Sequence, residues 1–369
     1  MVQFEKTDEA SMIRKTCLIV SMITLLALCS CEDNPSEFEP EPEPGKRNYV
    51  WTLDTLDMPM NYISSVWGAS PDDVWAVGGG GTQYDRLLHY DGTEWTTYTN
   101  ETIWCTGMTL FGFSADDVWM GGQAGWGERG AGIWHYDGVE WKQNYVYSIE
   151  ENYHAISVED IWGTSPNDVY ACGVISFFDG TNECWRGFVL HYDGANWREI
   201  ARADFNSQFL KIRAENGNVY VFSYGINYET GDGDVEFYQV VDNELQQIYS
   251  NKESEIYWAN MSSIGGKIFF LLGRELCRYQ DDSFIHVLSV DHDKYFAQVC
   301  GRHEKDLFVA RRDGIAHYNG TDIEYIYKFP FEKMRITGSP LIFENEIFYC
   351  IRNYGEYNNL VLHGYPVES

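Results

Sequence analysis

The chain has 369 residues and a formal net charge of −30, with 26 Lys and Arg residues against 56 Asp and Glu residues. A field of this sign repels nucleic acids and anionic membrane surfaces, so we expect no nucleic-acid partner. Aromatic residues make up 16% of the chain, which excludes the composition of a disordered acidic protein. The chain is therefore expected to fold.

The first 30 residues have the features of a targeting segment. Arg14 and Lys15 precede an apolar run, Cys17–Leu28, which is too short to span a bilayer comfortably as a permanent helix. The run ends in L-C-S-C and resembles a bacterial lipoprotein signal peptide, with Cys31 as the residue that is lipidated. An uncleaved anchor helix is the alternative.

Residues 31–48 are expected to form the lipidated cysteine and an extended tether. Glu32 and Asp33 follow Cys31 directly, and the segment then contains E-P-E-P-E-P-G. Alternating Pro and Glu residues stay extended and solvated, which predicts a stiff spacer. The acidic pair resembles the surface-export signal of Bacteroidetes lipoproteins. This resemblance implies an outer-membrane protein that is exposed at the cell surface and touches the membrane through its lipid only.

A recurring pattern dominates the rest of the chain. Over Val66–Trp95 it reads V-W-G-A-S-P-D-D-V-W-A-V-G and then H-Y-D-G-T-E-W, and close copies occupy Leu110–Trp141 and Ile161–Trp197. A repeat of roughly 45 residues is typical of solenoids, propellers and arrays. Degenerate copies follow, and together they predict seven repeats.

Each repeat is expected to form four antiparallel strands, a to d, which make one blade of a β-propeller. In the first repeat the predicted strands are Tyr62–Gly68, Val74–Gly78, Arg86–Tyr90 and Glu94–Tyr98. Between strands c and d, Asp91-Gly92 predicts a two-residue type I′ turn. Tyr49–Leu53 is expected to add the outer strand of the last blade and close the ring.

The repeats resemble the V-W-G-x-S-x-x-D-V-W-A-V-G and H-Y-D-G-x-x-W modules of bacterial surface and secreted propeller proteins. The chain is thus predicted to be all-β, with a single propeller of seven four-stranded blades over residues 49–369. The turn is also similar to the Asp-box of sialidase-type propellers. Because Asp91 and Gly92 adjoin where that motif has an intervening residue, sialidase activity is not implied.

The repeated polar and aromatic residues are interpreted as scaffold. Four histidines share one position of strand c and are expected to bond neighbouring turns rather than to form a metal or catalytic set: His89, His135, His191 and His317. Carboxylates just before strand b are expected to accept backbone N–H bonds within their turn: Asp73, Asp117 and Asp168. Trp67, Trp75 and Trp95 are assigned to packing between blades.

Function is expected where the repeats differ. The b–c connections are long in the first four repeats and short in the fifth and sixth: Gly79–Asp85, Gly122–Gly132, Val174–Gly187 and Ser223–Val235. They carry the candidate ligand-binding residues: Tyr84, Trp126, Arg129, Phe177, Phe178, Trp185, Arg186, Tyr224 and Tyr228. A sugar ring stacks on Trp or Tyr, and the same residue types dominate protein-binding hot spots. Packing of the loops on themselves is the alternative.

Other site chemistry has weaker support. Asp232, Asp234 and Glu236 offer oxygen ligands for Ca²⁺. The spacing of a calcium loop is absent, so a solvated acidic loop is favoured and no metal is expected. No motif for a phosphate, a nucleophile or zinc occurs, and no cofactor is expected. Cys172 and Cys184 bracket the third b–c connection and are candidates for a disulfide.

The leading hypothesis is a non-enzymatic, monomeric surface propeller that binds a glycan or a protein through the b–c connections of blades one to four. One alternative is a glycoside hydrolase or polysaccharide lyase with acidic residues at the axial pocket. Another is a structural subunit of an outer-membrane complex.

Overall fold

The computed structural model divides into two compact units, Met1–Pro42 and Glu43–Ser369. It describes residues 41–56, 62–79, 87–98, 103, 105–124, 130–178, 180, 183–204, 206–226, 233–251, 259–290 and 295–367. The predicted signal peptide, Cys31 and the first part of the predicted tether lie outside these ranges. Within them, no helix is long and apolar enough to cross a membrane.

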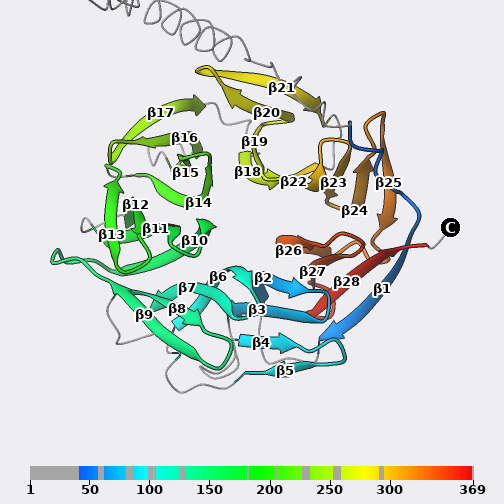
Figure 1. Ribbon diagram of the computed structural model, residues 1–369, viewed down its shortest axis with the longest axis horizontal. Coiled ribbons are helices and arrows are strands. Elements are labelled where there is room, and N and C mark those ends of the chain that lie inside the picture. Colours follow the sequence, from blue (N-terminus) through cyan, green and yellow to red (C-terminus); the bar gives the residue numbers. More distant parts are fainter. Residues whose placement is uncertain are drawn as a thin grey trace, which may run out of the picture. The chain divides into compact units, whose positions relative to one another are not determined.

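The described part of the second unit is all-β, and Figure 1 shows its sheets arranged in a ring. Five sheets have four strands each. Their strands are β2 (Tyr62–Ser70), β3 (Asp73–Gly79), β4 (Leu87–Tyr90) and β5 (Trp95–Thr97); β14 (Gln208–Glu215), β15 (Asn218–Ile226), β16 (Gly233–Val241) and β17 (Glu244–Asn251); β18 (Ala259–Ile264), β19 (Lys267–Leu272), β20 (Glu275–Gln280) and β21 (Ser283–Ser289); β22 (Tyr295–His303), β23 (Asp306–Arg311), β24 (Gly314–Tyr318) and β25 (Ile323–Lys328); β26 (Met334–Ile342), β27 (Ile347–Asn353), β28 (Asn358–Pro366) and β1 (Tyr49–Leu56).

A further eight strands form one sheet. They are β6 (Cys105–Ser114), β7 (Asp117–Ala124), β8 (Ala131–Tyr136), β9 (Trp141–Tyr147), β10 (Ala155–Ser165), β11 (Asp168–Phe178), β12 (Glu183–Tyr192) and β13 (Trp197–Arg202). Ser157 of β10 pairs with Gln123 of β7 and joins β6–β9 to β10–β13. The propeller-like arrangement of small four-stranded sheets is therefore confirmed. The prediction of seven separate blades is not, since five sheets stand alone and the rest are fused.

The two ends of the second unit close the ring. Strand β1 pairs antiparallel with β28 from Tyr49↔Pro366 to Leu56↔Asn359, as predicted. The residues just before β1 also contact the fold, because the Gly45 N–H bonds to Lys305 O at 2.8 Å and Arg47 forms ion pairs with Asp322 and Glu324. A Cβ on Gly45 would lie 2.2 Å from an Asp306 carboxylate oxygen, so only glycine fits there. Gly45 and Arg47, within the predicted tether, therefore contact the propeller, while most of residues 41–48 are exposed.

The turn between strands c and d differs from the predicted type I′ turn. Gly92 has a positive φ of 85°, and Asp91 does not, so the central pair is Gly92-Thr93, as in a type II′ turn. Asp91 Oδ1 instead accepts the backbone N–H groups of Thr93 and Glu94 at 2.9 and 3.0 Å. Equivalent contacts recur at Asp137, Asp193 and Asn319. The motif therefore needs an Asp or Asn at this position as a hydrogen-bond acceptor.

The glycine of each V-W-G or L-F-G motif lies under an aromatic ring from the preceding inner strand. A Cβ on Gly112 would lie 2.7 Å from the Trp67 ring, and a Cβ on Gly163 would lie 2.4 Å from Phe113. A Cβ on Gly68 would lie 3.1 Å from Phe343, which follows β26. At the next boundary Trp162 donates its indole N–H to Ala214 O at 3.2 Å. Adjacent repeats thus interlock through an aromatic ring and a residue without a large side chain.

Replacing Gly112 by alanine tests this interlock. The new Cβ meets the Trp67 ring and the Asp117 carbonyl oxygen at 2.7 and 2.8 Å. We expect Gly112→Ala to lower the free energy of unfolding by about 1–3 kcal/mol in urea denaturation, because well-packed regions resist added volume. Gly355→Ala is the matched control, because the atom nearest to a Cβ at Gly355 is the side-chain oxygen of Asn353, at 3.1 Å. Equal losses in the two variants would contradict the interlock.

Candidate functional site

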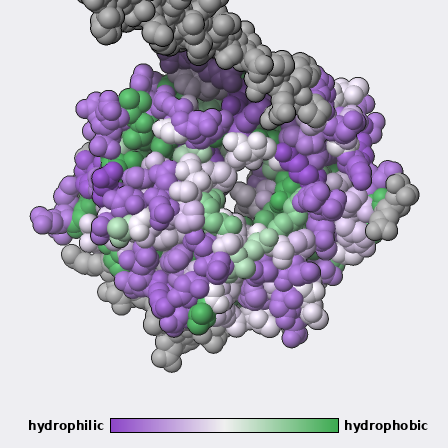
Figure 2. Space-filling model, in the orientation of Figure 1, coloured by the Kyte–Doolittle hydropathy of each residue, from purple (hydrophilic) through white to green (hydrophobic). Residues whose placement is uncertain are grey.

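The inner strands of the ring enclose an axial cavity of about 510 Å³. Its lining residues come from β2, β6, β10, β14, β18, β22 and β26. Figure 2 shows an opening at the centre of one face of the molecule. Strand a of each repeat therefore lines the axis, and all the inner strands contribute to one site.

Aromatic side chains line one arc of the cavity. Trp67 of β2, Phe111 of β6 and Trp162 of β10 are half-buried and face it. The Phe111 and Trp162 rings lie 5.1 Å apart, and the guanidinium of Arg213 lies over Trp162 at 4.6 Å. The predicted packing role of Trp67 is confirmed by its contact with Gly112, and the cavity wall is a second role that the sequence did not indicate.

A buried ion pair fixes the next part of the wall. Asp160 Oδ2 accepts hydrogen bonds from Arg213 Nη1 at 2.5 Å and from the Ile212 N–H at 2.9 Å. The two side chains are 7% and 10% exposed. Arg213 Nε has no hydrogen-bond partner among the described residues. Asp160 therefore has a structural role in the wall, while the buried Nε of Arg213 is a hydrogen-bond donor at the cavity.

Glu159 and Lys211 are the other charged groups of the cavity. Burial raises the pKa of Glu159. The hydrogen bond from Ser157 lowers this pKa, but the charge of Asp160 raises it further. Lys211 of β14 donates to Ser339 Oγ of β26 at 3.3 Å, so its side chain reaches across the ring. The ammonium of Lys211 thus joins β14 to β26 at the cavity.

Amide groups complete the polar lining. Gln298 of β22 donates to Gly338 O at 2.9 Å, and its buried Oε1 has no hydrogen-bond partner among the described residues. Asn260 of β18 lines the same cavity. The site therefore combines aromatic faces, one unsatisfied acceptor and two cations, which suits a polar ligand with an apolar face.

The candidate residues predicted from the sequence do not form one cluster. Tyr84, Trp126, Arg129, Tyr228 and Asp232 lie outside the described residues. Phe177 is 9% exposed and packs in the core between β7 and β11, whereas Tyr224 packs against the core formed with β19. Phe178 is 61% exposed and meets His154 edge-on at 5.1 Å.

The third and fourth b–c connections are mostly strand rather than loop. Strands β11 and β12 pair out to Phe178↔Glu183, so the connection itself is residues 179–182. Trp185 pairs with Ser176, and Arg186 binds Glu151 at 3.3 Å. The prediction that this sector is extended is confirmed, since β11 has 11 residues and β19 has 6. The extension is therefore a hairpin of paired strands, in which Ala171 to Phe177 of β11 are buried.

The described residues do not support the calcium and disulfide candidates. Glu236 accepts hydrogen bonds from Tyr238 and Gln247 at 2.6 and 2.7 Å, and no described group of three His, Cys, Asp or Glu residues suits a metal. Neither Cys172 nor Cys184 is in a disulfide. Cys172 pairs with Val189 and Cys184 with Phe177, which separates them by about 17 Å along the sheet, far beyond a disulfide's reach.

The repeated histidines bind the repeated carboxylates directly. The prediction that each histidine bonds a neighbouring turn is confirmed, because these carboxylates stand where the a–b turn meets strand b, but the carboxylates bond an imidazole where backbone N–H groups were predicted. Nε2 of His89, His135 and His191 lies 2.7, 2.7 and 2.8 Å from Oδ1 of Asp73, Asp117 and Asp168. Each imidazole also packs on a strand-b ring, as His89 does on Trp75 at 4.3 Å. The sequence missed this because the two motif halves are separated by variable gaps. The interpretation of these residues as scaffold is nevertheless supported.

The most buried of these pairs joins His317 and Asp306, which are 0% and 3% exposed and hydrogen-bond at 2.6 Å. Burial alone would raise the pKa of Asp306, yet bonds from His317 and Arg302 hold it below its usual range. Its carboxylate is thus stabilised by its partners.

Removing His317 tests this structural role. His317→Ala leaves Asp306 without one partner, and we expect the free energy of unfolding to fall by about 3 kcal/mol in urea denaturation. The control is His286→Ala, whose pair with Glu275 is 56% and 47% exposed, where about 0–1 kcal/mol is expected. A small effect at His317 would show that the pair is dispensable for stability.

Comparisons with known proteins support the fold. No protein-family model matches the chain, and no curated protein sequence matches it. Several solved structures do match. The structure of YCF48 bound to a D1 peptide matches with 13% identity, a TM-score of 0.58, and coverage of 89% of this chain and 100% of that chain. A streptogramin B lyase matches with 13% identity, a TM-score of 0.55, and coverage of 85% and 97%. An inactive virginiamycin B lyase from Staphylococcus aureus with quinupristin matches with 12% identity, a TM-score of 0.55, and coverage of 86% and 100%. At such identities the likeness shows a β-propeller fold alone.

Proposed function

We propose that this chain is a non-enzymatic β-propeller lipoprotein of the cell surface that binds a glycan in its axial cavity. The fused sheet β6–β13 counts as two blades in this proposal, which gives seven. The observation that carries the proposal is the composition of the cavity wall. Aromatic faces on β2, β6 and β10 lie in one cavity with the amide of Gln298 and the ammonium of Lys211.

The chemistry of a sugar matches this wall. The apolar face of a pyranose ring packs on an indole ring such as that of Trp67 or Trp162, while its hydroxyls both donate and accept hydrogen bonds. Gln298 Oε1 is a buried acceptor, and burying an unsatisfied acceptor is costly unless a ligand or water bonds to it. A cavity of about 510 Å³ also lies in the usual range for ligand sites, roughly 300–1,000 Å³.

The lipid anchor belongs to the same proposal. Cys31 would hold the protein to the outer membrane, and the Pro-Glu segment would keep the propeller away from the lipid. Because Gly45 and Arg47 contact the sheet of β22–β25, the free tether ends before them. The extended β11–β12 hairpin with exposed Phe178 would add contacts for a longer ligand.

An enzymatic role is the second candidate, favoured by the raised pKa of Glu159 in the cavity. Glycoside hydrolysis by two carboxylates requires acids on both sides of the scissile bond. The described lining offers Glu159 and Asp160, which are neighbours on β10, and Asp160 is bound by Arg213. Binding without hydrolysis therefore fits the described geometry better.

Binding of the full chain to a glycan array tests the proposal. We expect at least one glycan to bind, and Lys211→Met combined with Gln298→Leu to weaken it at least tenfold, because each hydrogen bond to a charged or buried group contributes about 1–3 kcal/mol.

The control is Trp185→Ala, which lies on the β11–β12 hairpin outside the cavity lining. If Trp185→Ala abolishes binding and the cavity variant does not, the ligand sits on the hairpin instead. Release of reducing sugar by the wild-type protein would replace the binding role with the enzymatic one, and binding only to a protein would remove the glycan assignment.

A further inference from the structure

A second hollow, of about 590 Å³, lies between the sheet of β14–β17 and the sheet of β18–β21. It shares no lining residue with the axial cavity. The turn residues Asn216 and Asp281 line it together with side chains of β15, β16 and β20, so it opens at the strand ends where the a–b and c–d turns lie. We call it the β15–β20 groove.

At the first two boundaries between repeats the corresponding space is filled by aromatic rings. Trp75 of β3 lies 5.1 Å from Tyr136 of β8 and 5.4 Å from Trp141 of β9. Trp119 of β7 is covered in the same way by Tyr192 and Trp197, at 5.2 and 5.7 Å. In both cases a tyrosine and a tryptophan from the next repeat cover a tryptophan on strand b.

At the β15–β20 groove this filling is altered on both sides. Tyr220 of β15 is the third residue of its strand, as Trp75 is of β3. Phe284 pairs with Tyr279 as Trp141 pairs with Tyr136. Phe284 packs on Tyr279 and Phe270, at 4.9 and 5.4 Å, and Tyr220, which lines the groove, meets Tyr279 at 6.1 Å. A smaller ring therefore stands at the groove wall where a tryptophan fills the first two boundaries.

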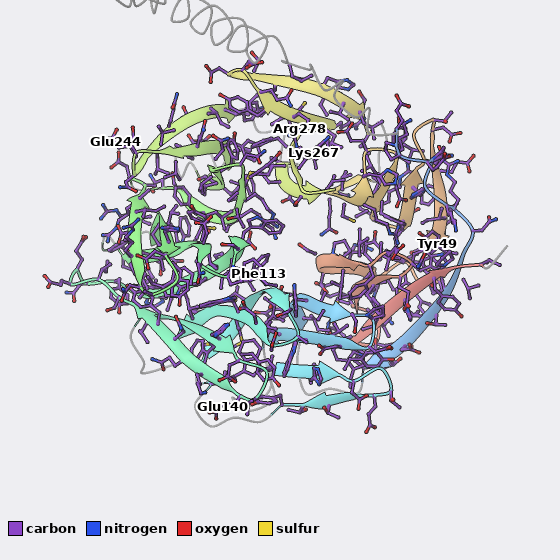
Figure 3. The ribbon with its side chains drawn as sticks, in the orientation of Figure 1. Tyr49, Phe113, Glu140, Glu244, Lys267 and Arg278 are labelled. Carbon is purple, nitrogen blue, oxygen red and sulfur yellow. The ribbon has the colours of Figure 1, made fainter. Side chains whose placement is uncertain are left out.

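The base of the groove is held by an ion pair that crosses between the sheets. Arg278, labelled in Figure 3, occupies the strand-c position of the repeated histidines and donates to Glu215 at 3.1 Å and to Ile268 O at 2.8 Å. Both charged side chains are mostly buried, at 14% and 16% exposed. In other repeats the histidine bonds within its own sheet. Here the replacement joins two sheets and fixes the groove walls.

The walls carry amides and tyrosines. Asn216, Asn218, Gln239 and Gln280 line the groove with Tyr220 and Tyr279. Gln239 donates to Asn218 at 2.9 Å, which orients both amides. Each amide presents a donor and an acceptor, as vicinal sugar hydroxyls require. The neighbouring Asp281 and Asp282 have positive φ of 48° and 57°, and a type I′ turn selects Asp there, so these carboxylates are explained without a cationic ligand.

We propose that the β15–β20 groove is a second binding site for a neutral saccharide, on the side of the ring formed by the a–b and c–d turns. The sugar lies against the tyrosine rings and hydrogen-bonds to the amides. This site is independent of the axial cavity, and it would let one surface-anchored molecule hold two parts of a polysaccharide or two chains.

The test compares two variants of the full chain, one in which amide side chains of the groove are removed and one in which a larger aromatic ring fills the groove. Neutral oligosaccharides from a glycan array are titrated calorimetrically against the wild-type protein, a Gln239→Ala plus Gln280→Ala variant, and Tyr220→Trp, which places at the groove wall the ring found at Trp75. We expect at least a tenfold loss of affinity in the first variant and no groove binding in the second. Gln246→Ala is the control, since Gln246 pairs with Gln239 but does not line the groove.

The Lys211→Met plus Gln298→Leu variant separates the two sites. Groove binding should persist in it, so loss of the axial site alone leaves this proposal standing. Saccharide binding that all groove variants retain, or absence of saccharide binding to the wild-type protein, overturns it. Binding of an oligolysine peptide in place of saccharides, lost in Tyr220→Trp, would also overturn the saccharide assignment.

Discussion

The packing of an aromatic ring over a motif glycine in the next repeat is the contact on which the ring of repeats depends. Trp67 over Gly112 and Phe113 over Gly163 are two instances, and Phe343 over Gly68 carries the contact across the closure between the last and first repeats. A side chain on any of these glycines would hold the repeats apart. Repetition of the motif therefore follows from repetition of one steric requirement.

The axial cavity is a consequence of the same contact. Trp67 and Trp162 pack toward a neighbouring sheet and also line the cavity, so scaffold and binding wall are made by the same residues. The inner-strand position of Lys211 and Asn260 is polar in the regular repeats as well, where Ser65, Thr109 and Asp160 occupy it. The aromatic faces of the cavity thus come from the regular repeats, whereas its hydrogen-bonding groups come from regular and less regular repeats alike.

The sequence predicted the strands, the turns and the closing pair well, because alternation, Asp-Gly turns and the repeat itself are local signals. It mislocated the site. The b–c connections differ most in length, yet Phe177 is buried in a core and Tyr224 packs against another, since the extra residues of β11 and β15 extend strands. Nor could local signals reveal which carboxylate His89 binds, or that Phe284 packs on Phe270 where Trp141 packs on Trp75, since both depend on partners in other strands.

A crystal structure of the full chain with the tightest-binding oligosaccharide tests the central claim most directly. The axial site predicts sugar density inside the ring, with a pyranose ring on Trp67 or Trp162 and a hydroxyl bonded to Gln298 Oε1. Sugar on the β11–β12 hairpin, with only water in the axial cavity, would contradict it.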